Sequence, residues 1–290
     1  MRNVTKDNIT DAFESYFGPD TDPRFKEVMT SMAKHLHAFA KDVHLTHAEW
    51  NKGIAFLEAM TEFTTKDRHE FVLLSDVMGL SSLVDMINTV EGGTSSSVLG
   101  PFHVAGSPVI PFGFDMKRHY PGPVLLATGV VRSMDGTPIE GAELDIWQTA
   151  PNGLYSSQDD EQDTYSFHGI QYTDADGRYG FTTVKPVMYE VPTDGPVGDI
   201  LRTSGRHAWR PSHLHFIAKA PGHRTLVSEV FADEDPYLDG DAVFGVRSDL
   251  IMQYHEQPAG TFPAEGYELS GKVDGPWLKV DFDLTLVPES

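Results

Sequence analysis

The chain of 290 residues contains no cysteine. This absence excludes disulfide bridges, thiolate metal ligands, iron–sulfur clusters and cysteine nucleophiles. Any metal ion would therefore be held by histidine, tyrosine, aspartate or glutamate side chains. Basic residues are also scarce, with 22 Lys and Arg against 43 Asp and Glu, and the formal net charge of −21 argues against a nucleic-acid-binding surface.

Long hydrophobic runs are missing as well. No uninterrupted apolar stretch approaches the roughly 20 residues that a helix needs to cross a bilayer. No N-terminal segment combines a charged start, an apolar run and a small-residue cleavage site. We therefore expect a cytoplasmic protein. Hydrophobic residues make up 40% of the chain, which is enough for the packed core of one large domain, with or without a smaller one.

The N-terminal third of the chain has the periodicity of helices. From Asp22 to Leu45, apolar side chains recur at steps of three and four residues, which predicts a helix with one apolar stripe. The members of this stripe are Phe25, Val28, Met29, Met32, Leu36 and Phe39. Thr46 and Glu49 have the T-x-x-E spacing of a capping box and predict the start of a second helix. A further helical pattern runs through HEFVLLSDVMGLSSLVDMINTV. Such stripes pack in a core or between subunits, and a helical layer with surplus apolar surface would suit a dimer interface.

The composition changes after the segment EGGTSSSVLGPF. Short runs rich in β-branched and aromatic residues follow, such as LLATGVV, AELDIW and LHFIAK, and turn signals such as Asp135-Gly136 and Asp176-Gly177 divide them. Strands at this spacing predict an antiparallel sandwich or barrel. We therefore predict an α+β protein with a helical domain over residues 1–95 and a β-sandwich domain over residues 96–290.

Common catalytic motifs are absent from the sequence. There is no G-x-G-x-x-G after a strand, no Walker motif, no G-x-S-x-G and no H-E-x-x-H. The best lead is RPSHLHF, because alternate side chains of a strand share a face. His213 and His215 would lie side by side, while Leu214 and Phe216 would face the other way. The two histidines are either metal ligands or ordinary packed or surface residues, and Arg210 is either a cation near them or a surface ion-pair partner.

Two tyrosines are candidates for further ligands. A zinc hydrolase would add a third histidine or a carboxylate, and a ferrous oxygenase would add a carboxylate, but H-x-[DE] is absent. Tyr155 in APNGLYSSQ and Tyr189 in KPVMYEVPTDG lie in settings rich in glycine and proline. A tyrosine in such a place can also simply pack or bond to the backbone. The residue types alone leave these alternatives open.

Three segments taken together carry a family resemblance. DIWQTAPNGLYS, TDADGRYGFTTVKPVMYEVP and RHAWRPSHLHF, in this order and spacing, resemble the intradiol ring-cleaving dioxygenases that act on catechols. The resemblance extends from LGPFHVAGSP through DAVFGVRSDL, and the helical region resembles the dimerisation domain of that family, so nearly the whole chain is covered. It implies one Fe(III) per subunit, bound by Tyr155, Tyr189, His213 and His215.

The implied ligand set is chemically consistent. A free phenol has a pKa of about 10, so only a strong Lewis acid keeps two phenols ionised at neutral pH, and hard anionic oxygen ligands favour ferric over ferrous iron. In this family the diol binds iron through both oxygens. The departing tyrosinate, by analogy Tyr189, is then both ligand and base. Arg210 would stabilise the negative charge that develops on the ring and hold the ring in place.

The choice of substrate is implied by the pocket. FVLLSDVMGLSSLV and DEDPYLDGDAVFGVRSDLI are most similar to the family members that cleave hydroxyquinol, benzene-1,2,4-triol, to 3-hydroxy-cis,cis-muconate, the enol form of maleylacetate. In those members the position of Asp76 is acidic, and a third substrate hydroxyl could donate to it. The alternative is that Asp76 only caps or pairs within its helix. The resemblance places further residues around the ring: Leu73, Val98, Leu99, Gly100, Pro101, Phe102, Val191, Pro192 and Val243.

The sequence departs from the family pattern at one position, and other functions remain as alternatives. Glu229 stands where catechol-cleaving relatives commonly have glutamine behind the iron, and it could bond to a histidine ligand or a water. The nearest rival is a catechol or substituted-catechol 1,2-dioxygenase that yields cis,cis-muconates. Rivals from other classes are a β-sandwich that binds aromatics without converting them and a zinc hydrolase. The resemblance also implies a homodimer through the N-terminal helices, with a phospholipid-like molecule between them.

Overall fold

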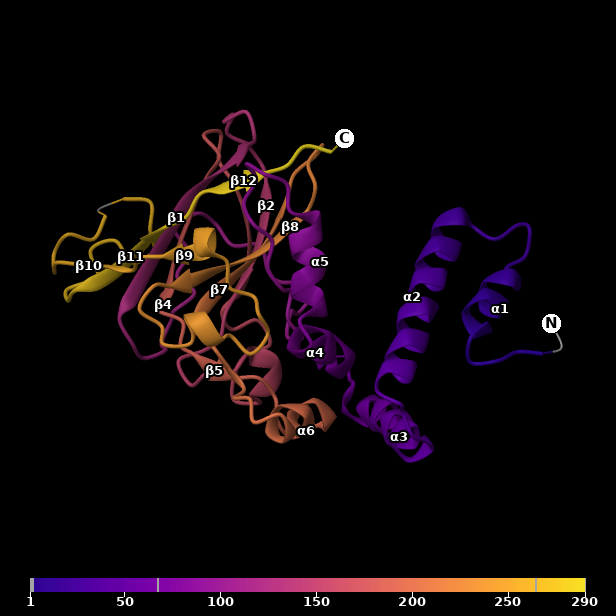
Figure 1. The fold of residues 1–290 in the computed structure, drawn as a ribbon. Helices are drawn as coiled ribbons and strands as arrows, with labels where there is room; N and C mark the ends of the chain where they lie inside the picture. Colours follow the sequence, from indigo (N-terminus) through magenta and orange to yellow (C-terminus); the bar gives the residue numbers. More distant parts are fainter. Residues whose placement is uncertain (1–2, 67, 264, 290) are drawn as a thin grey trace. The chain divides into compact units, whose positions relative to one another are not determined.

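The chain forms two compact units, which divide between Ala59 and Met60. The computed structural model describes residues 3–66, 68–263 and 265–289 (Figure 1). The first unit is helical, and the second contains the sheets and the remaining helices. None of the helices in these described residues is long and apolar enough to span a membrane.

Two of the helices, α2 and α3, begin at capping residues. Those at the N-terminal end are α1 (Ile9–Ser15), α2 (Pro23–Asp42) and α3 (His47–Phe63). Asp22 caps α2, since its Oδ1 accepts a hydrogen bond from the Phe25 backbone N–H at 2.8 Å. The capping box at α3 is confirmed. The Thr46 N–H donates to Glu49 Oε2 at 2.9 Å, and the Glu49 N–H donates to Thr46 Oγ1 at 3.3 Å.

The apolar stripe predicted between Asp22 and Leu45 lies on α2 and is largely exposed. Phe25 is 57% exposed and Leu36 is 56% exposed, and Val28, Met32 and Phe39 are each about half exposed. Side chains of this kind spaced along one helix face are typical of a surface that another protein or an apolar molecule covers.

The helical pattern predicted between residues 69 and 90 is two helices and not one. α4 (Glu70–Val77) ends before Gly79, which has φ +74, and α5 (Leu80–Asn88) begins after it. Glycine adopts this left-handed conformation without strain, so the chain turns although the apolar pattern continues. Both helices belong to the second compact unit, so that unit begins before the domain boundary predicted after residue 95. The boundary between independently folding domains stays a prediction.

Two five-stranded sheets form the centre of the second unit among the described residues. One has the order β10-β11-β1-β12, with β4 also pairing with β1, and the other has the order β3-β2-β7-β8-β9. A two-stranded ribbon, β5-β6, lies apart from them, and α6 (Pro196–Thr203) packs against α4. The strands are β1 (Val124–Ser133), β2 (Glu143–Trp147), β3 (His168–Tyr172), β4 (Arg178–Val184), β5 (Tyr189–Glu190), β6 (Trp209–Arg210), β7 (His213–Lys219), β8 (Leu226–Ala232), β9 (Ile251–Met252), β10 (His255–Gln257), β11 (Trp277–Asp281) and β12 (Leu284–Leu286).

The sheets are mixed, whereas the sequence predicted an antiparallel sandwich. β1 pairs antiparallel with β4 but parallel with both β11 and β12, and β8 pairs parallel with β9. The parallel partners are short strands near the C-terminal end of the chain. The general expectation of a helical region followed by a sheet-rich region is confirmed.

The core lies between the two large sheets. Leu125 and Phe181 of the first sheet and Leu214 and Phe216 of the second are fully or almost fully buried in the same apolar cluster. On β7, Ile217 belongs instead to a smaller cluster on the opposite face of its sheet. The predicted alternation is therefore confirmed, because Leu214 and Phe216 face the core, and His213 and His215, which alternate with them, face away from it.

Gly129 in the middle of β1 should be intolerant of a side chain. A Cβ there would lie 2.0 Å from the Phe282 carbonyl oxygen and 2.7 Å from Tyr179 Oη, with no room to relax. We expect Gly129→Ala to destabilise the protein by about 1 to 3 kcal/mol, as overpacking does. A Cβ at Gly275 would meet no atom within 4 Å, so Gly275→Ala is the matched control. Thermal unfolding of both variants tests this, and equal melting temperatures would contradict the prediction.

Candidate metal centre

The site lies on the outer face of the second sheet. His215 of β7 stands directly between Trp147 of β2 and Glu229 of β8 in the strand register. The Trp147 and His215 rings stack with centroids 4.5 Å apart and planes 3° from parallel. His213 lies two residues earlier on the same face, as the H-x-H spacing predicts. Each of these four side chains is at most 2% exposed.

Two imidazole nitrogens and two phenol oxygens converge in front of this face. The Nε2 atoms of His213 and His215 are 3.0 Å apart, and Tyr155 Oη lies 3.2 Å from the first and 3.1 Å from the second. Tyr189 Oη lies 3.4 Å from Tyr155 Oη. The structure thus brings together the four residues that the sequence resemblance named as ligands.

The turn after β2 positions Tyr155. Gly153 has φ +80, and its N–H donates to the Ala150 carbonyl oxygen, which reverses the chain. Tyr155 then stands at the start of the short helix η1 (Ser156–Gln158). Its backbone N–H donates to Gln158 Oε1 at 3.1 Å. The Phe102 ring stacks on Tyr155 with centroids 5.1 Å apart, so the phenol is held from both the backbone and the ring side.

The β5-β6 ribbon positions Tyr189 together with Arg210. These two residues are direct partners in the antiparallel pair. Only Pro211 and Ser212 separate Arg210 from His213, so the ribbon leads straight into β7. A Cβ on Gly153 would lie 3.5 Å from Tyr189 Cβ, which shows that the Tyr155 turn packs closely on the ribbon.

The electrostatics favour neutral histidines, and the backbone contact of His213 leaves its Nε2 as an acceptor. His213 Nδ1 lies 2.7 Å from the Pro211 carbonyl oxygen and must donate to it, so Nε2 of the neutral ring is an acceptor. Burial lowers the pKa of His213, and burial together with His213 lowers the pKa of His215 further. Burial also raises the pKa of Tyr155 and of Tyr189. Because the pKa of Tyr189 stays raised even with Arg210 beside it, neither phenol would ionise at neutral pH unless it were bound to a metal cation.

The donor set fits a metal ion. Ligand atoms about 2.0 to 2.1 Å from a tetrahedral first-row metal stand about 3.3 to 3.4 Å apart. The three separations among Tyr155 Oη and the two Nε2 atoms, and that between the two phenol oxygens, are 3.0 to 3.4 Å. Glu229 also lies close, 3.4 Å from His213 Nε2. Both of its carboxylate oxygens already accept hydrogen bonds from Arg210, so the two phenols are better placed than Glu229 to complete the set.

Two carboxylates hold Arg210 beside the ligand cluster. Glu229 accepts from Nη1 at 2.8 Å and from Nη2 at 3.1 Å, and Asp241 accepts from Nε at 3.0 Å and from Nη2 at 3.2 Å. Burial opposes ionisation of Glu229, yet the Arg210 guanidinium more than compensates and lowers its pKa below the usual range. Glu229 is thus an ion-pair partner of Arg210, a role that the sequence did not predict.

Sequence reasoning missed three residues of the site. Asp241 was not singled out, Ser97 donates to Glu229 and to the Gly245 carbonyl oxygen, and Trp147 supports His215. The position of Trp147, immediately before the Tyr155 turn in DIWQTAPNGLY, was the available signal. Asp241 and Ser97 lie in segments that have no regular pattern.

The residues implied to surround the substrate ring are mostly buried near these side chains. A Cβ on Gly100 would lie 3.8 Å from His215 Cε1, which places this backbone against the cluster. Val191 and Pro192 line a surface pocket that also includes Tyr189. Leu99 is 40% exposed and Gly100 and Pro192 are half-buried, whereas the other members are buried: Leu73, Asp76, Val98, Pro101, Phe102, Val191 and Val243. Their contact with a substrate stays a prediction.

Asp76 is a buried carboxyl group on α4, only 1% exposed. Burial raises its pKa to about 6, although a hydrogen bond from Ser81 and the charge of Arg210 oppose the rise. The helix that carries it is tied to the Asp241 loop, because Arg206 donates to the carbonyl oxygens of Val77 and Ala242, each at 2.8 Å.

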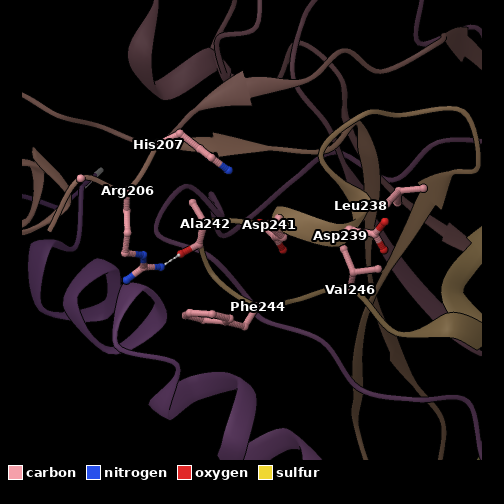
Figure 2. Close-up of a pocket in the computed structure, with 10 residues that line it drawn as sticks. Arg206, His207, Leu238, Asp239, Asp241, Ala242, Phe244 and Val246 are labelled. Carbon is pink, nitrogen blue, oxygen red and sulfur yellow. Dashed lines mark hydrogen bonds between the residues drawn. The ribbon is translucent and has the colours of Figure 1, made fainter.

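A pocket of about 370 Å³ opens on the other side of this loop (Figure 2). Arg206, His207, Ala242 and Phe244 line it, and Asp241 is the residue that it shares with the Arg210 cluster. Figure 2 shows the Arg206 guanidinium bonded to the Ala242 carbonyl oxygen at one side of this pocket. The pocket is therefore a neighbour of the ligand cluster and not the cluster itself.

Comparison with known proteins identifies related chains along the whole length. A family model described as dioxygenase matches residues 105–275, and one described as catechol dioxygenase N terminus matches residues 22–93. A 6-chlorohydroxyquinol 1,2-dioxygenase of Cupriavidus pinatubonensis is 41% identical over 99% of each chain.

Two solved structures have the same fold. A hydroxyquinol 1,2-dioxygenase of Pseudomonas putida superimposes with a TM-score of 0.84 at 42% identity, covering 98% of this chain and 99% of that one. A catechol 1,2-dioxygenase of an Acinetobacter species superimposes with a TM-score of 0.82 at 26% identity, covering 100% of this chain and 94% of that one. With matching family models over both regions and relatives of this similarity, the chain belongs to the intradiol ring-cleavage dioxygenase family and is an enzyme of that family.

Proposed function

We propose that the protein cleaves hydroxyquinol between its two adjacent hydroxylated carbons with O2, giving 3-hydroxy-cis,cis-muconate. The observation that carries the proposal is the convergence of two imidazole Nε2 atoms and two phenol oxygens, in which Tyr155 Oη lies 3.1 to 3.4 Å from each of the other three donors and the two Nε2 atoms are 3.0 Å apart. We further propose that Tyr155, Tyr189, His213 and His215 hold one Fe(III) per subunit. A site in which two of four donors are phenolates suits the harder ferric ion.

The metal ion and several side chains would each contribute to the ring cleavage. When bound, the ferric ion would withdraw electron density from the diol and so prepare the ring for reaction with O2. Tyr189 Oη would accept a proton from one diol hydroxyl as the diol replaces it. Arg210 would offer its positive charge to the anionic diol, held in place by Glu229 and Asp241. Trp147, Phe102 and the turn around Gly153 would keep bulk water away from the reacting groups.

Asp76 would select the triol over the diol. Burial makes a carboxylate costly, and a third hydroxyl on the substrate would give Asp76 a hydrogen-bond donor in addition to Ser81. Two of the relatives described above carry names of hydroxyquinol-type activity at 41% and 42% identity, while the catechol enzyme is 26% identical. Catechol or a substituted catechol is the alternative substrate, for which Asp76 would offer nothing to bind.

The assembly is also part of the proposal. The exposed stripe of α2 supports a homodimer formed through the N-terminal helices, because a second copy would cover side chains such as Phe25 and Leu36. A phospholipid-like molecule between such helices is consistent with the same apolar surface. The cytoplasmic location stays a prediction from the sequence.

The visible absorption spectrum of the freshly purified protein tests the ligand set. A phenolate bound to Fe(III) should give a broad charge-transfer band, which should move to longer wavelength when hydroxyquinol is added without oxygen. Tyr155→Phe should weaken or abolish the band. Tyr254→Phe is the matched control, since Tyr254 is a buried tyrosine whose hydroxyl has no partner among the described residues. A colourless protein with full iron content would show that the tyrosines are not ligands.

Asp76→Ala tests the choice of substrate. Loss of a hydrogen bond to a charged acceptor should lower kcat/KM for hydroxyquinol about 10- to 100-fold, while kcat/KM for catechol should change little. Initial rates of O2 uptake on the two substrates measure this. Asp85→Ala on the neighbouring helix α5 removes another partly buried carboxyl group and is the control. Equal losses on both substrates would rule out the assigned role of Asp76.

Asp76→Asn should reveal the raised pKa as a stability effect. Because the pKa of Asp76 is about 6 in the folded protein against 3.8 normally, the folded state holds this proton more tightly than the unfolded chain. The resulting stability is present in full below about pH 4 and is lost as the pH rises through 6. As the pH rises from about 4 to above 6, the wild type should therefore lose about 1 to 3 kcal/mol of stability that Asp76→Asn does not lose. The melting temperature of the variant should rise relative to that of the wild type over this range. A margin that does not change with pH would contradict this.

A further inference from the structure

We propose that Asp241 is a positioning residue that, together with Glu229, fixes the plane of the Arg210 guanidinium, and that Gly245 is the residue that leaves room for this clamp. The inference rests on the proposed function, because it assigns a role to the cation of that site. We call Arg210, Glu229 and Asp241 the guanidinium clamp.

The first argument is a count of hydrogen-bond donors. A guanidinium has five N–H groups in a fixed plane. Asp241 takes one from Nε and one from Nη2, and Glu229 takes one from Nη1 and one from Nη2, at 2.8 to 3.2 Å. One N–H of Nη1 remains, and this nitrogen lies 3.4 Å from His213 Nε2. The two carboxylates therefore leave a single N–H, directed at the ligand cluster.

The second argument is that Asp241 is itself immobilised. Its Oδ1 also accepts from the Val243 backbone N–H at 3.3 Å, and its Oδ2 also accepts from the Gly245 N–H at 2.8 Å. Each carboxylate oxygen thus receives one bond from Arg210 and one from the loop that follows Asp241. An asparagine would retain the shape but would replace one acceptor oxygen by an NH2 group, which would face N–H donors.

The third argument concerns the space around the clamp. A Cβ on Gly245 would lie 2.8 Å from Arg210 Nη2, 2.9 Å from Glu229 Oε2 and 3.0 Å from Asp241 Oδ2. The backbone of Gly245 is not in the left-handed region, so conformation alone does not require glycine there. Any side chain would enter the clamp and push at least one of the three charged groups aside.

The loop is also pinned from the opposite side. Phe244 has φ +59, a strained value for this residue, and its carbonyl oxygen accepts from Ser82 Oγ at 2.6 Å and from Arg247 Nη1 at 2.9 Å. The Arg206 guanidinium lies 5.0 Å from the centre of the Phe244 ring. Figure 2 shows Asp241, Ala242 and Phe244 at the edge of the pocket that Arg206 and His207 also line. The surrounding structure therefore sets where Asp241, and through it Arg210, can lie.

Oxygen-uptake kinetics of Asp241→Asn and Gly245→Ala test the clamp. Both should lower kcat and kcat/KM for hydroxyquinol about 10- to 100-fold, the range for weakening charge-assisted hydrogen bonds that matter in the reacting state. Iron content and the visible band should stay as in the wild type, because none of the four ligand residues is changed. Asp239→Asn is the control, since Asp239 is an exposed carboxylate two residues away and should stay within about twofold of the wild type.

A double-variant cycle separates positioning from general stability. In an Arg210→Lys background there is no planar guanidinium to orient, so adding Asp241→Asn should cost less than about threefold in kcat/KM. The same full loss in both backgrounds would overturn the inference, as would loss of iron and of the visible band in Asp241→Asn and Gly245→Ala. If the wild type consumes O2 with hydroxyquinol and Asp241→Asn matches it, only this inference fails. If the wild type consumes none, the proposed function fails and this inference fails with it.

Discussion

The alternation of side chains along β7 is the constraint on which the site depends. Leu214 and Phe216 are buried between the two large sheets, and their burial fixes the register of the strand. A slip of one residue would turn both large apolar side chains out of the core, at a cost of several kcal/mol. The packing of Leu214 and Phe216 in the core therefore keeps His213 and His215 on the opposite face of the sheet, although the histidines are not part of that core. The same core packing stabilises the fold and orients the two imidazole rings.

The site also depends on buried ion pairs. Arg210, Glu229 and Asp241 are all buried, and charged groups in that environment are tolerated only when each finds its partners. The bidentate contacts on both sides of the guanidinium satisfy this condition, so a fixed positive charge can lie beside neutral imidazoles and phenols. Removing one carboxylate would leave two buried N–H groups of Arg210 without their acceptors.

The sequence was most informative where the chemistry is local. The capping box of Thr46 and Glu49, the glycine turns and the H-x-H alternation depend on neighbours in the chain, and each of them is found in the structure. The break at Gly79 was missed because the apolar pattern continues through it. The parallel partners of β1 were missed because strand patterns do not show which strands will pair.

The ligand set required more than local pattern. Nothing in the spacing of Tyr155 and Tyr189 shows that their hydroxyls meet the two histidines, and only the family resemblance suggested it. The Asp241 contact with Arg210 joins residues 31 positions apart through a loop without periodicity. Contacts of this kind are set by the folded loop as a whole, so residue types alone could not reveal them.

The origin of Asp76 has a consequence for how such enzymes diversify. The four proposed ligands come from the sheet, the β5-β6 ribbon and the turn after β2, whereas Asp76 comes from the eight-residue helix α4, far earlier in the chain. Arg206 joins α4 to the Asp241 loop through the backbone carbonyl oxygens of Val77 and Ala242, which are present whatever side chains α4 carries. If Asp76 selects the substrate as proposed, mutations within this one short helix can change the ring substituent that the enzyme accepts while the four proposed ligands stay the same.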